Sequence, residues 1–433
     1  MQWVDENGKL IGMDTPKVVI DNAVCPTATL VQVHIATKRG VLLDALQLFA
    51  DLDLSVKKAY ISCDGWWFMY LFHVTDRFGR KLTDGVTAYI QQSVGAWTEP
   101  SQPVALAGLT VLELTGVDRT GLISELFAVL ADMGCSVVAA SAWTHRGRLA
   151  CLVYLRDVDA VRVARIESRL GALFRGVSDD ASAGVVAVPA HSVPHPDRRL
   201  HQLMCAARDP DRAFPTSSVS VESCGERGYS VVTVQCPDRP KLLYDVVCTL
   251  ADMDYLVVDG TVDTSRGEAR QEFYIRNADG SPTSSEAEMQ RVSQRLQDAI
   301  ERRSFEGVRL ELRTPDRPEL LSDVTRTFRE NGLLVTQAEV STKGDMATGV
   351  FYVTGTTAGQ PVHQSAIDAV RERVGIDCLV VEEHRPQLYE DDHNGAGTGL
   401  LYSLGNLVKM KFYNLGLIWM YIPRFRNKRP RFI

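Results

Sequence analysis

The chain alternates between two kinds of hydrophobic pattern, and this alternation occurs four times. Each repeat opens with a short apolar or alternating run that is typical of a β-strand: 30–35, 110–114, 230–234 and 308–312. The period then becomes helical, as at Leu122, Leu126 and Leu130. Two further strand-like runs and a second amphipathic stretch follow, and that stretch is clearest at 284–303. These patterns predict the order β-α-β-β-α in every repeat.

One short signature marks the step from the first strand to the first helix of each repeat. It occupies Thr37–Leu42, Asp118–Ile123, Asp238–Leu243 and Asp316–Leu321. The signature recurs after 81, 120 and 78 residues, so about 40 extra residues lie between the second and third repeats. Units of about 80 residues are too long for solenoid repeats and long enough to be small domains.

Glycines mark the turn between the second and third strands of each repeat and supply the positive φ of a tight hairpin. We expect these turns at Asp64-Gly65, Arg146-Gly147, Arg266-Gly267 and Lys343-Gly344. A last strand is expected at 185–188 in the second repeat and at 379–382 in the fourth. The final strand is poorly marked in the first repeat and hardly visible in the third. The predicted fold class is α+β, with four tandem ferredoxin-like βαββαβ domains and antiparallel sheets.

The predicted domain organisation follows from these repeats. It comprises an N-terminal segment 1–27, domains at 28–98 and 108–189, a linker 190–227, domains at 228–304 and 307–385, and a C-terminal tail 386–433. The tail is basic and aromatic, and Lys409 and Lys411 interrupt its apolar stretch, which disfavours a transmembrane span. We expect the tail to lie on a membrane surface or against a partner, or else to be disordered.

The repeated residues resemble the ACT domain, a small ligand-binding regulatory module. The resemblance is carried by a strand, then D-R-x-G-L-[LI], then a helix that ends near A-D-M-G, as at residues 118–134. Four such units with a long spacer after the second resemble the plant ACT-repeat family, called ACR, over residues 25–385. This resemblance implies amino-acid binding and a part in sensing or regulation.

Composition and charge narrow the remaining classes. The 433 residues are 45% hydrophobic and carry a formal charge of −7, which disfavours both a disordered chain and a basic nucleic-acid binder. The nine cysteines form no C-x-x-C pair, which fits a reducing compartment. No signal peptide is visible at the start. We therefore expect an intracellular protein, cytoplasmic or nuclear or both, with no nucleic-acid partner.

The loop between the first strand and the first helix is the candidate ligand site. A helix N-terminus offers unsatisfied N–H groups and a positive dipole end to the carboxylate of an amino acid. A glycine lets the backbone approach a small ligand closely, and an aspartate can face the ammonium group. The second repeat has the complete set: Asp118, Thr120, Gly121, Leu122 and Ile123.

The other repeats keep only part of this set. The first keeps Gly40 but has Thr37 in place of the aspartate. The third and fourth keep Asp238 and Asp316, but Lys241 and Glu319 replace the glycine. We therefore expect the second repeat to bind ligand and the others to be partly structural. In the alternative reading, the aspartate serves only as a helix N-cap and the glycine only the turn.

The sequence favours an amino-acid-binding sensor with its ligand at a domain interface near this loop. The alternative is a non-enzymatic interaction scaffold that binds no metabolite. We expect no enzyme activity, catalytic residue, cofactor or metal site, because no G-x-S-x-G, H-E-x-x-H or P-loop pattern occurs. Free amino acids are the expected partners. A homo-oligomer or a protein partner through the ACT sheets is also considered, and the domains are expected to pair first with second and third with fourth, or between chains.

Overall fold

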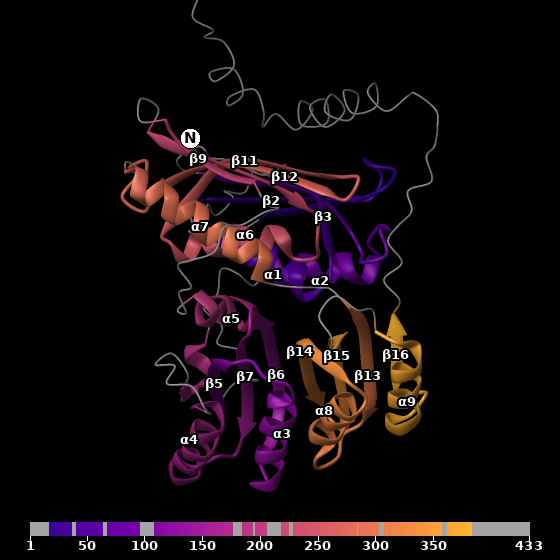
Figure 1. The fold of residues 1–433 in the computed structure, drawn as a ribbon. Helices are drawn as coiled ribbons and strands as arrows, with labels where there is room; N and C mark the ends of the chain where they lie inside the picture. The colour runs from indigo at the N-terminus through magenta and orange to yellow at the C-terminus, as the bar shows by residue number, and fades with distance from the viewer. Residues whose placement is uncertain are drawn as a thin grey trace, which may run out of the picture. The chain divides into compact units, whose positions relative to one another are not determined.

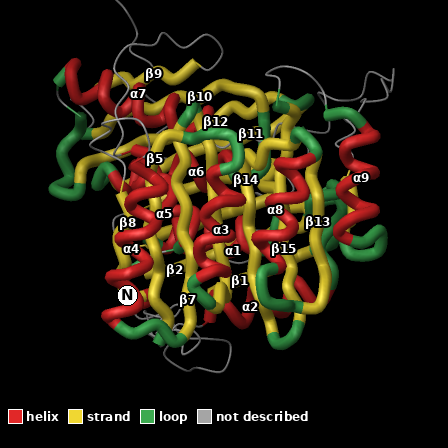
Figure 2. Tube along the Cα trace, turned by 60° about the horizontal axis from the view of Figure 1, so that its bottom comes forward, coloured by secondary structure: helices red, strands yellow, loops and turns green. Residues whose placement is uncertain are grey.

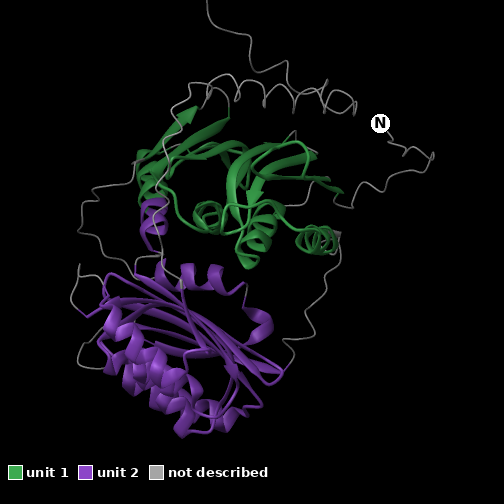
Figure 3. Ribbon diagram, turned by 90° about the vertical axis from the view of Figure 1, so that its right-hand side faces the viewer, with its two compact units in different colours: residues 1–100, 216–294, 388–433 green, residues 101–215, 295–387 purple. Residues whose placement is uncertain are grey.

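The computed structural model describes residues 17–36, 40–63, 67–95, 108–175, 184–193, 195–205, 218–224, 228–283, 285–302, 307–356 and 362–382. The chain forms two compact units (Figure 3). The first contains residues 1–100, 216–294 and 388–433, and the second contains residues 101–215 and 295–387. The C-terminal tail, for which membrane or partner contact was expected, lies outside the described residues. Among the described residues, no helix combines the length and apolar character needed to cross a bilayer.

The first unit is built around one eight-stranded antiparallel sheet of order β1-β2-β4-β3-β11-β12-β10-β9. Figure 1 labels β2, β3, β9, β11 and β12 of this sheet. Its strands are β1 Lys17–Asp21, β2 Thr29–Ala36, β3 Ser55–Cys63, β4 Trp67–Thr75, β9 Ser218–Cys224, β10 Tyr229–Pro237, β11 Tyr255–Ser265 and β12 Glu268–Asn277. Its helices are α1 Val41–Asp51, α2 Asp84–Gly95, α6 Leu242–Asp252 and α7 Glu286–Arg302, in which the division between the units falls.

The second unit has a sheet of the same size, of order β16-β13-β15-β14-β6-β7-β5-β8. Its strands are β5 Leu109–Val117, β6 Ser136–His145, β7 Arg148–Arg156, β8 Gly184–Pro189, β13 Val308–Pro315, β14 Leu333–Lys343, β15 Met346–Gly355 and β16 Leu379–Glu382. The helices that cover one face (Figure 2) are α3 Leu122–Asp132, α4 Ala160–Arg175, α8 Leu320–Glu330 and α9 Gln364–Val374.

The predicted linker contains a helix that belongs to the second unit. This helix, α5 (Pro196–Cys205), packs Leu200 and Met204 against Trp143 on the face of the sheet opposite α3. The Arg199 guanidinium donates two hydrogen bonds of 2.6 Å to the Glu113 carboxylate beneath it. The extra residues between the second and third domains therefore cover a sheet face that would otherwise be exposed.

The domains pair first with third and second with fourth, which corrects the expected order. In the first unit β3 pairs with β11, and in the second unit β6 pairs with β14, with Ala140 opposite Val340. Polar contacts support both seams. Lys58 Nζ lies 3.0 Å from Asp263 Oδ2 in the first unit, and the Thr144 hydroxyl donates to the Thr336 carbonyl at 3.4 Å in the second. Because all four second strands are alike, the repeat pattern alone did not indicate which two would meet.

The strand order departs from the expected βαββαβ in the first and third domains. There the position beside the first strand is filled by β1 and β9, which precede that strand along the chain. β1 lies inside the predicted N-terminal segment, and β9 lies inside the predicted linker. Because β1 and β9 occupy the place of a final strand, the sequence shows no clear final strand at the end of the first or third domain. In the second and fourth domains β8 and β16 come last, as predicted.

Local details recur at equivalent positions in the four domains. The second strand of each carries a β-bulge, between Val56/Lys58, Val137/Ala139, Val257/Asp259 and Val335/Gln337. The hairpin turns at Arg146-Gly147 and Arg266-Gly267 have positive φ at both residues, which confirms two predicted tight turns. The fourth turn lies one residue later than predicted, at Gly344-Asp345. The first lies outside the described residues.

The paired domains of the second unit share one hydrophobic core. It includes Leu126 and Leu130 from α3, Phe328 from α8, and Phe351 from β15. The rings of Phe328 and Phe351 meet edge to face, with centroids 5.2 Å apart. Because the core is shared, we expect the second and fourth domains to unfold together as one cooperative unit.

Truncating Phe328 to alanine tests this shared core. The fully buried ring leaves a cavity, so the free energy of unfolding should fall by about 3–5 kcal/mol. Hydrogen exchange should show faster exchange in β6 and β7 of the second domain as well as in the fourth. Loss of protection confined to residues 307–382 would contradict a shared core. As the control, Val380→Ala on the exposed side of β16 should change stability by no more than about 0.5 kcal/mol.

Candidate functional site

The signature forms a tight turn that leads into the first helix. The N–H groups of Leu122, Leu242 and Leu320 each donate to the carbonyl three residues earlier, at 3.0, 3.3 and 3.2 Å. The residue before each of these leucines is the helix N-cap, and so is Gly40 before Val41. All four N-caps are left-handed: Gly40, Gly121, Lys241 and Glu319, with φ of 92, 86, 59 and 66°. Left-handed backbone costs a non-glycine residue roughly 1–2 kcal/mol, so glycine suits this position for reasons of conformation alone.

The signature aspartates are not the N-caps of the helices, in contrast to the alternative interpretation of the sequence. No side-chain capping hydrogen bond occurs at these helix starts. The aspartate N–H instead donates to the carbonyl of the neighbouring hairpin turn, from Asp118 to Gly147 at 2.7 Å and from Asp316 to Asp345 at 2.8 Å. The backbone of the aspartate thus ends the strand ladder, and its carboxylate is not used as a helix cap.

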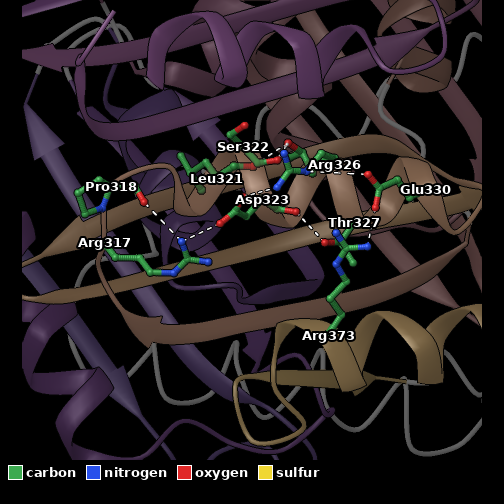
Figure 4. Close-up of polar contacts among 10 residues, drawn as sticks. Arg317, Pro318, Leu321, Ser322, Asp323, Arg326, Thr327, Glu330 and Arg373 are labelled. Carbon is green, nitrogen blue, oxygen red and sulfur yellow. Dashed lines mark hydrogen bonds and ion pairs between the residues drawn. The ribbon is translucent and has the colours of Figure 1, made fainter. Parts of the chain in front are cut away.

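An arginine clamp, defined here as the signature arginine with the acid six residues later, braces three of these turns. Arg119 pairs with Glu125, Arg239 Nη1 lies 2.6 Å from Asp245 Oδ2, and Arg317 Nη1 lies 2.7 Å from Asp323 Oδ2. In Figure 4 the Arg317 side chain reaches back to Asp323, and Arg326 approaches the same carboxylate. Sequence reasoning missed the clamp, although its constant spacing is visible in the sequence.

The pairing of domains places the second, third and fourth loops, which the structure describes, beside the end of the partner's first helix. In the second unit α3 and α8 pack against each other. The loop of the fourth domain therefore lies near the end of α3, and the loop of the second domain lies near the end of α8. We call these two places the fourth-loop seam and the second-loop seam.

The fourth-loop seam contains a cavity of about 450 Å³. This volume lies in the range of small-molecule pockets, roughly 300–1,000 Å³. The fourth domain lines it with 316–322, 340–342 and 347–348, and the second domain with Phe127, Leu130, Ala131 and 134–139. The lining combines the acidic residues Asp316 and Glu319, Arg317, which is paired with Asp323, several hydroxyl groups and apolar side chains. A zwitterion with a small side chain matches this mixture.

The second-loop seam is occupied by an arginine. A Cβ placed on Gly121 would lie 2.7 Å from Cδ and 3.4 Å from Nη1 of Arg329, near the end of α8. The side chain of Arg329 therefore lies directly on the glycine. Hydrogen bonds from Arg119 and the nearby charge of Arg329 hold the pKa of Glu125 below its ordinary value. The residues that sequence analysis favoured as a binding site thus meet a protein side chain.

The third domain's loop, in the first unit, has only a small cavity of about 30 Å³ at its seam. That is room for about one water molecule. Tyr244 and Gln271 line it, and both side chains are buried. Their equivalents in the fourth domain, 78 residues later, are Ser322 and Gly349. Of these two, Ser322 lines the large cavity, so the position that Tyr244 occupies beside the third loop has a smaller side chain beside the fourth.

The predicted site residues are thus distributed among different seams. Asp118, Thr120 and Gly121 lie together in the second loop, whereas Leu122 and Ile123 point their buried side chains into the core. Asp238 lines the small cavity of the first unit, and Asp316 lines the large cavity of the second. Gly40 begins α1, but residues 37–39 before it lie outside the described part of the chain. The chain therefore does not bring all of these residues into one site.

Two of the signature aspartates have shifted pKa values. Burial raises the pKa of Asp118 from 3.8 to about 6, against a hydrogen bond from the Arg119 backbone. Burial also raises the pKa of Asp238, and the charge of Lys57 partly opposes this. The carboxyl groups at these loops therefore ionise less readily than an exposed aspartate.

The arginine clamps differ in burial, and this difference predicts different effects of mutation. Asp245 is fully buried and Arg239 is 14% exposed, whereas Arg317 and Asp323 are 54% and 29% exposed. Arg239→Ala should remove the cation that lies 2.6 Å from this buried carboxylate and lower the free energy of unfolding by about 3–5 kcal/mol. Arg317→Ala is the matched variant and should cost less than about 1 kcal/mol. Urea unfolding measures both, and equal losses would contradict this ranking.

The raised pKa of Asp118 predicts a dependence of stability on pH. The folded state binds the proton more tightly than the unfolded state, so ionisation of Asp118 destabilises the fold. Asp118→Asn removes this ionisation. The stability of Asp118→Asn relative to the original chain should therefore rise between about pH 4 and 6 and level off above pH 6. This range lies between the ordinary pKa of 3.8 and the folded-state pKa of about 6. Urea unfolding at several pH values measures this, and a difference constant from pH 3.5 to 7 would contradict it.

Comparison with known proteins agrees with this architecture. A model described as the ACR family N-terminal ACT domain matches residues 24–100, and an ACT domain model matches residues 110–175. ACT domain-containing protein ACR8 of Arabidopsis thaliana is 50% identical over 96% of this chain and 98% of its own length. The Arabidopsis proteins ACR4 and ACR5 are 44% and 42% identical, each over 96% of this chain and over 98% and 97% of their own lengths. The chain belongs to the ACR family of ACT-domain proteins.

Proposed function

We propose that this protein is an amino-acid sensor and that its ligand binds in the cavity of the fourth-loop seam. The observation that carries the proposal is a cavity of about 450 Å³ where a signature loop faces the helix of another domain. The equivalent space at the third domain's loop is about 30 Å³, too small for an amino acid. ACT domains are typically amino-acid-sensing regulatory modules, which supports the same function.

The lining suits the two charged groups of an amino acid. The carboxylates of Asp316 and Glu319 attract the ammonium group. The N–H groups of Leu321 and Ser322 in the first turn of α8 have no acceptor within the helix and lie at its positive end. They are the donors that we assign to the ligand carboxylate. A ligand side chain would contact Phe127, Leu130 and Val340, which form the apolar part of the lining.

Ligand in this cavity would contact two domains at once. The second domain contributes the end of α3 and the start of β6, and the fourth contributes its signature loop and β14. A ligand that binds one arrangement of the two domains better than another shifts the population toward that arrangement. The cavity thus supplies the differential contacts that a regulatory response requires.

Filling the cavity tests the proposal. Ser322→Tyr places at the fourth loop the residue type that the third domain has at Tyr244, and it should abolish amino-acid binding by occlusion. Ser322→Ala is the matched control, because it keeps the space open and should still bind. Asp316→Asn should weaken binding by roughly tenfold or more, because a hydrogen bond to a charged group contributes about 1.5–3 kcal/mol. Calorimetric titration with each of the twenty amino acids measures these affinities.

The result also distinguishes the sensor from a scaffold. Saturable binding of a few amino acids by the original chain, lost in Ser322→Tyr but kept in Ser322→Ala, supports the sensor. Absence of binding at millimolar concentration, in protein whose circular dichroism and thermal transition show a folded state, contradicts it. That outcome would favour an interaction scaffold whose ACT domains bind no metabolite.

A further inference from the structure

We infer that Arg329 is a built-in occupant of the second-loop seam, and that the second unit therefore has one amino-acid site instead of two. This inference rests on the proposed function of the fourth-loop seam. From either edge of the second unit's sheet, the strands follow in the same order within their domain: last, first, third, second. The second-loop and fourth-loop seams therefore occupy equivalent positions in the two domains. They differ in the residue that the partner helix presents to the loop.

The difference lies at one position near the end of the first helix of each domain. Three domains have alanine there, at Ala50, Ala131 and Ala251, and the fourth has Arg329. Ala131 lines the open cavity beside the fourth loop, and Ala50 lines the small cavity beside the third. An alanine leaves the seam open unless other residues fill it. The arginine places a long side chain in the equivalent space beside the second loop.

The contacts of Arg329 show how it occupies the seam. Its Cδ lies so near Gly121 that a Cβ there would be 2.7 Å away, closer than such atoms approach one another. The methylene stem therefore covers the face of the loop that a ligand backbone would need. The guanidinium brings a positive charge toward Glu125, as an ammonium group would. The seam thus already contains an apolar stem and a cation, supplied by the protein.

This arrangement also accounts for the glycine of the second loop. The left-handed conformation alone does not require it, because Lys241 and Glu319 adopt the same conformation in their domains. A Cβ at position 121 would lie 2.7 Å from Cδ of Arg329, so any side chain there would force the arginine stem to move away from the loop. Glycine at position 121 therefore lets the Arg329 stem lie directly against the second loop, whereas the fourth loop faces Ala131 and has Glu319 at the equivalent position.

Exchanging the two residues tests the inference. Arg329→Ala should open the second-loop seam and raise the calorimetric stoichiometry by one amino acid per chain over the original protein. Ala131→Arg should close the fourth-loop seam and lower the stoichiometry by one. The double variant should regain the original stoichiometry with the site moved to the other seam. Each of the twenty amino acids is titrated separately into each full-length variant, and circular dichroism confirms folding.

Cys135 reports which seam is occupied. This half-buried residue lines the fourth-loop cavity, whereas Leu333 holds its position at the other seam. An amino acid at about 100 times its Kd should slow carboxamidomethylation of Cys135 by iodoacetamide roughly 100-fold in the original chain and in Arg329→Ala. In the double variant, amino acid should bind without protecting Cys135. Mass spectrometry of the peptide that contains Cys135 gives the rate.

The outcomes separate the inference from the proposed function. If no amino acid binds the original chain, the proposed function fails. If one binds and Arg329→Ala folds without gaining a site, only the inference fails. Arg329→Met provides a control of similar length without charge, and it should gain no site because its stem still fills the space. If Arg329→Met gained a site, the inference that the side-chain stem fills the second-loop seam would be wrong. This test does not depend on whether Ala131→Arg folds.

Discussion

The antiparallel pairing of second strands is the interaction on which the rest of the structure depends. It joins β3 to β11 and β6 to β14, and so converts four small sheets into two sheets of eight strands. Each pairing covers a strand edge that an isolated domain would expose. It also brings the first helices of the two domains together, which places every described signature loop beside a helix of its partner. The loop supplies half of each seam, and the partner supplies the other half.

The repeated backbone therefore produces different seams from similar loops. Ser322 lines the open cavity beside the fourth loop, whereas the larger Tyr244 stands at the equivalent position and lines the small cavity beside the third. An arginine from the opposite helix occupies the seam of the second loop. The domains therefore share a backbone fold, and individual side chains determine how much free volume remains at each seam. A protein with four related domains can in this way carry fewer ligand sites than domains.

The sequence predicted the features that depend on local pattern. Periodicity located the helices and strands of each repeat, and the glycines located two hairpin turns. It did not predict β1 and β9, because these edge strands occupy positions that the ferredoxin-like order assigns to the end of a domain. The partner of each domain was also missed, because pairing joins residues far apart in the chain. The loop residues could be predicted as a candidate site because they form a signature that is local in the sequence. The roles of Ala131 and Arg329 could not be predicted, because each faces a loop of the partner domain.

The arginine clamps explain why such different seams share one loop conformation. Each clamp ties the turn before the helix to the first turn of the helix itself, through a contact that lies within one domain. The turn is thus held independently of what the partner domain presents across the seam. A loop ordered in advance loses less conformational entropy when a ligand binds, so more of the contact energy appears as affinity. The clamp at Arg317 and Asp323 therefore prepares the fourth loop for a ligand, and the same clamp at Arg119 and Glu125 holds the second loop for Arg329.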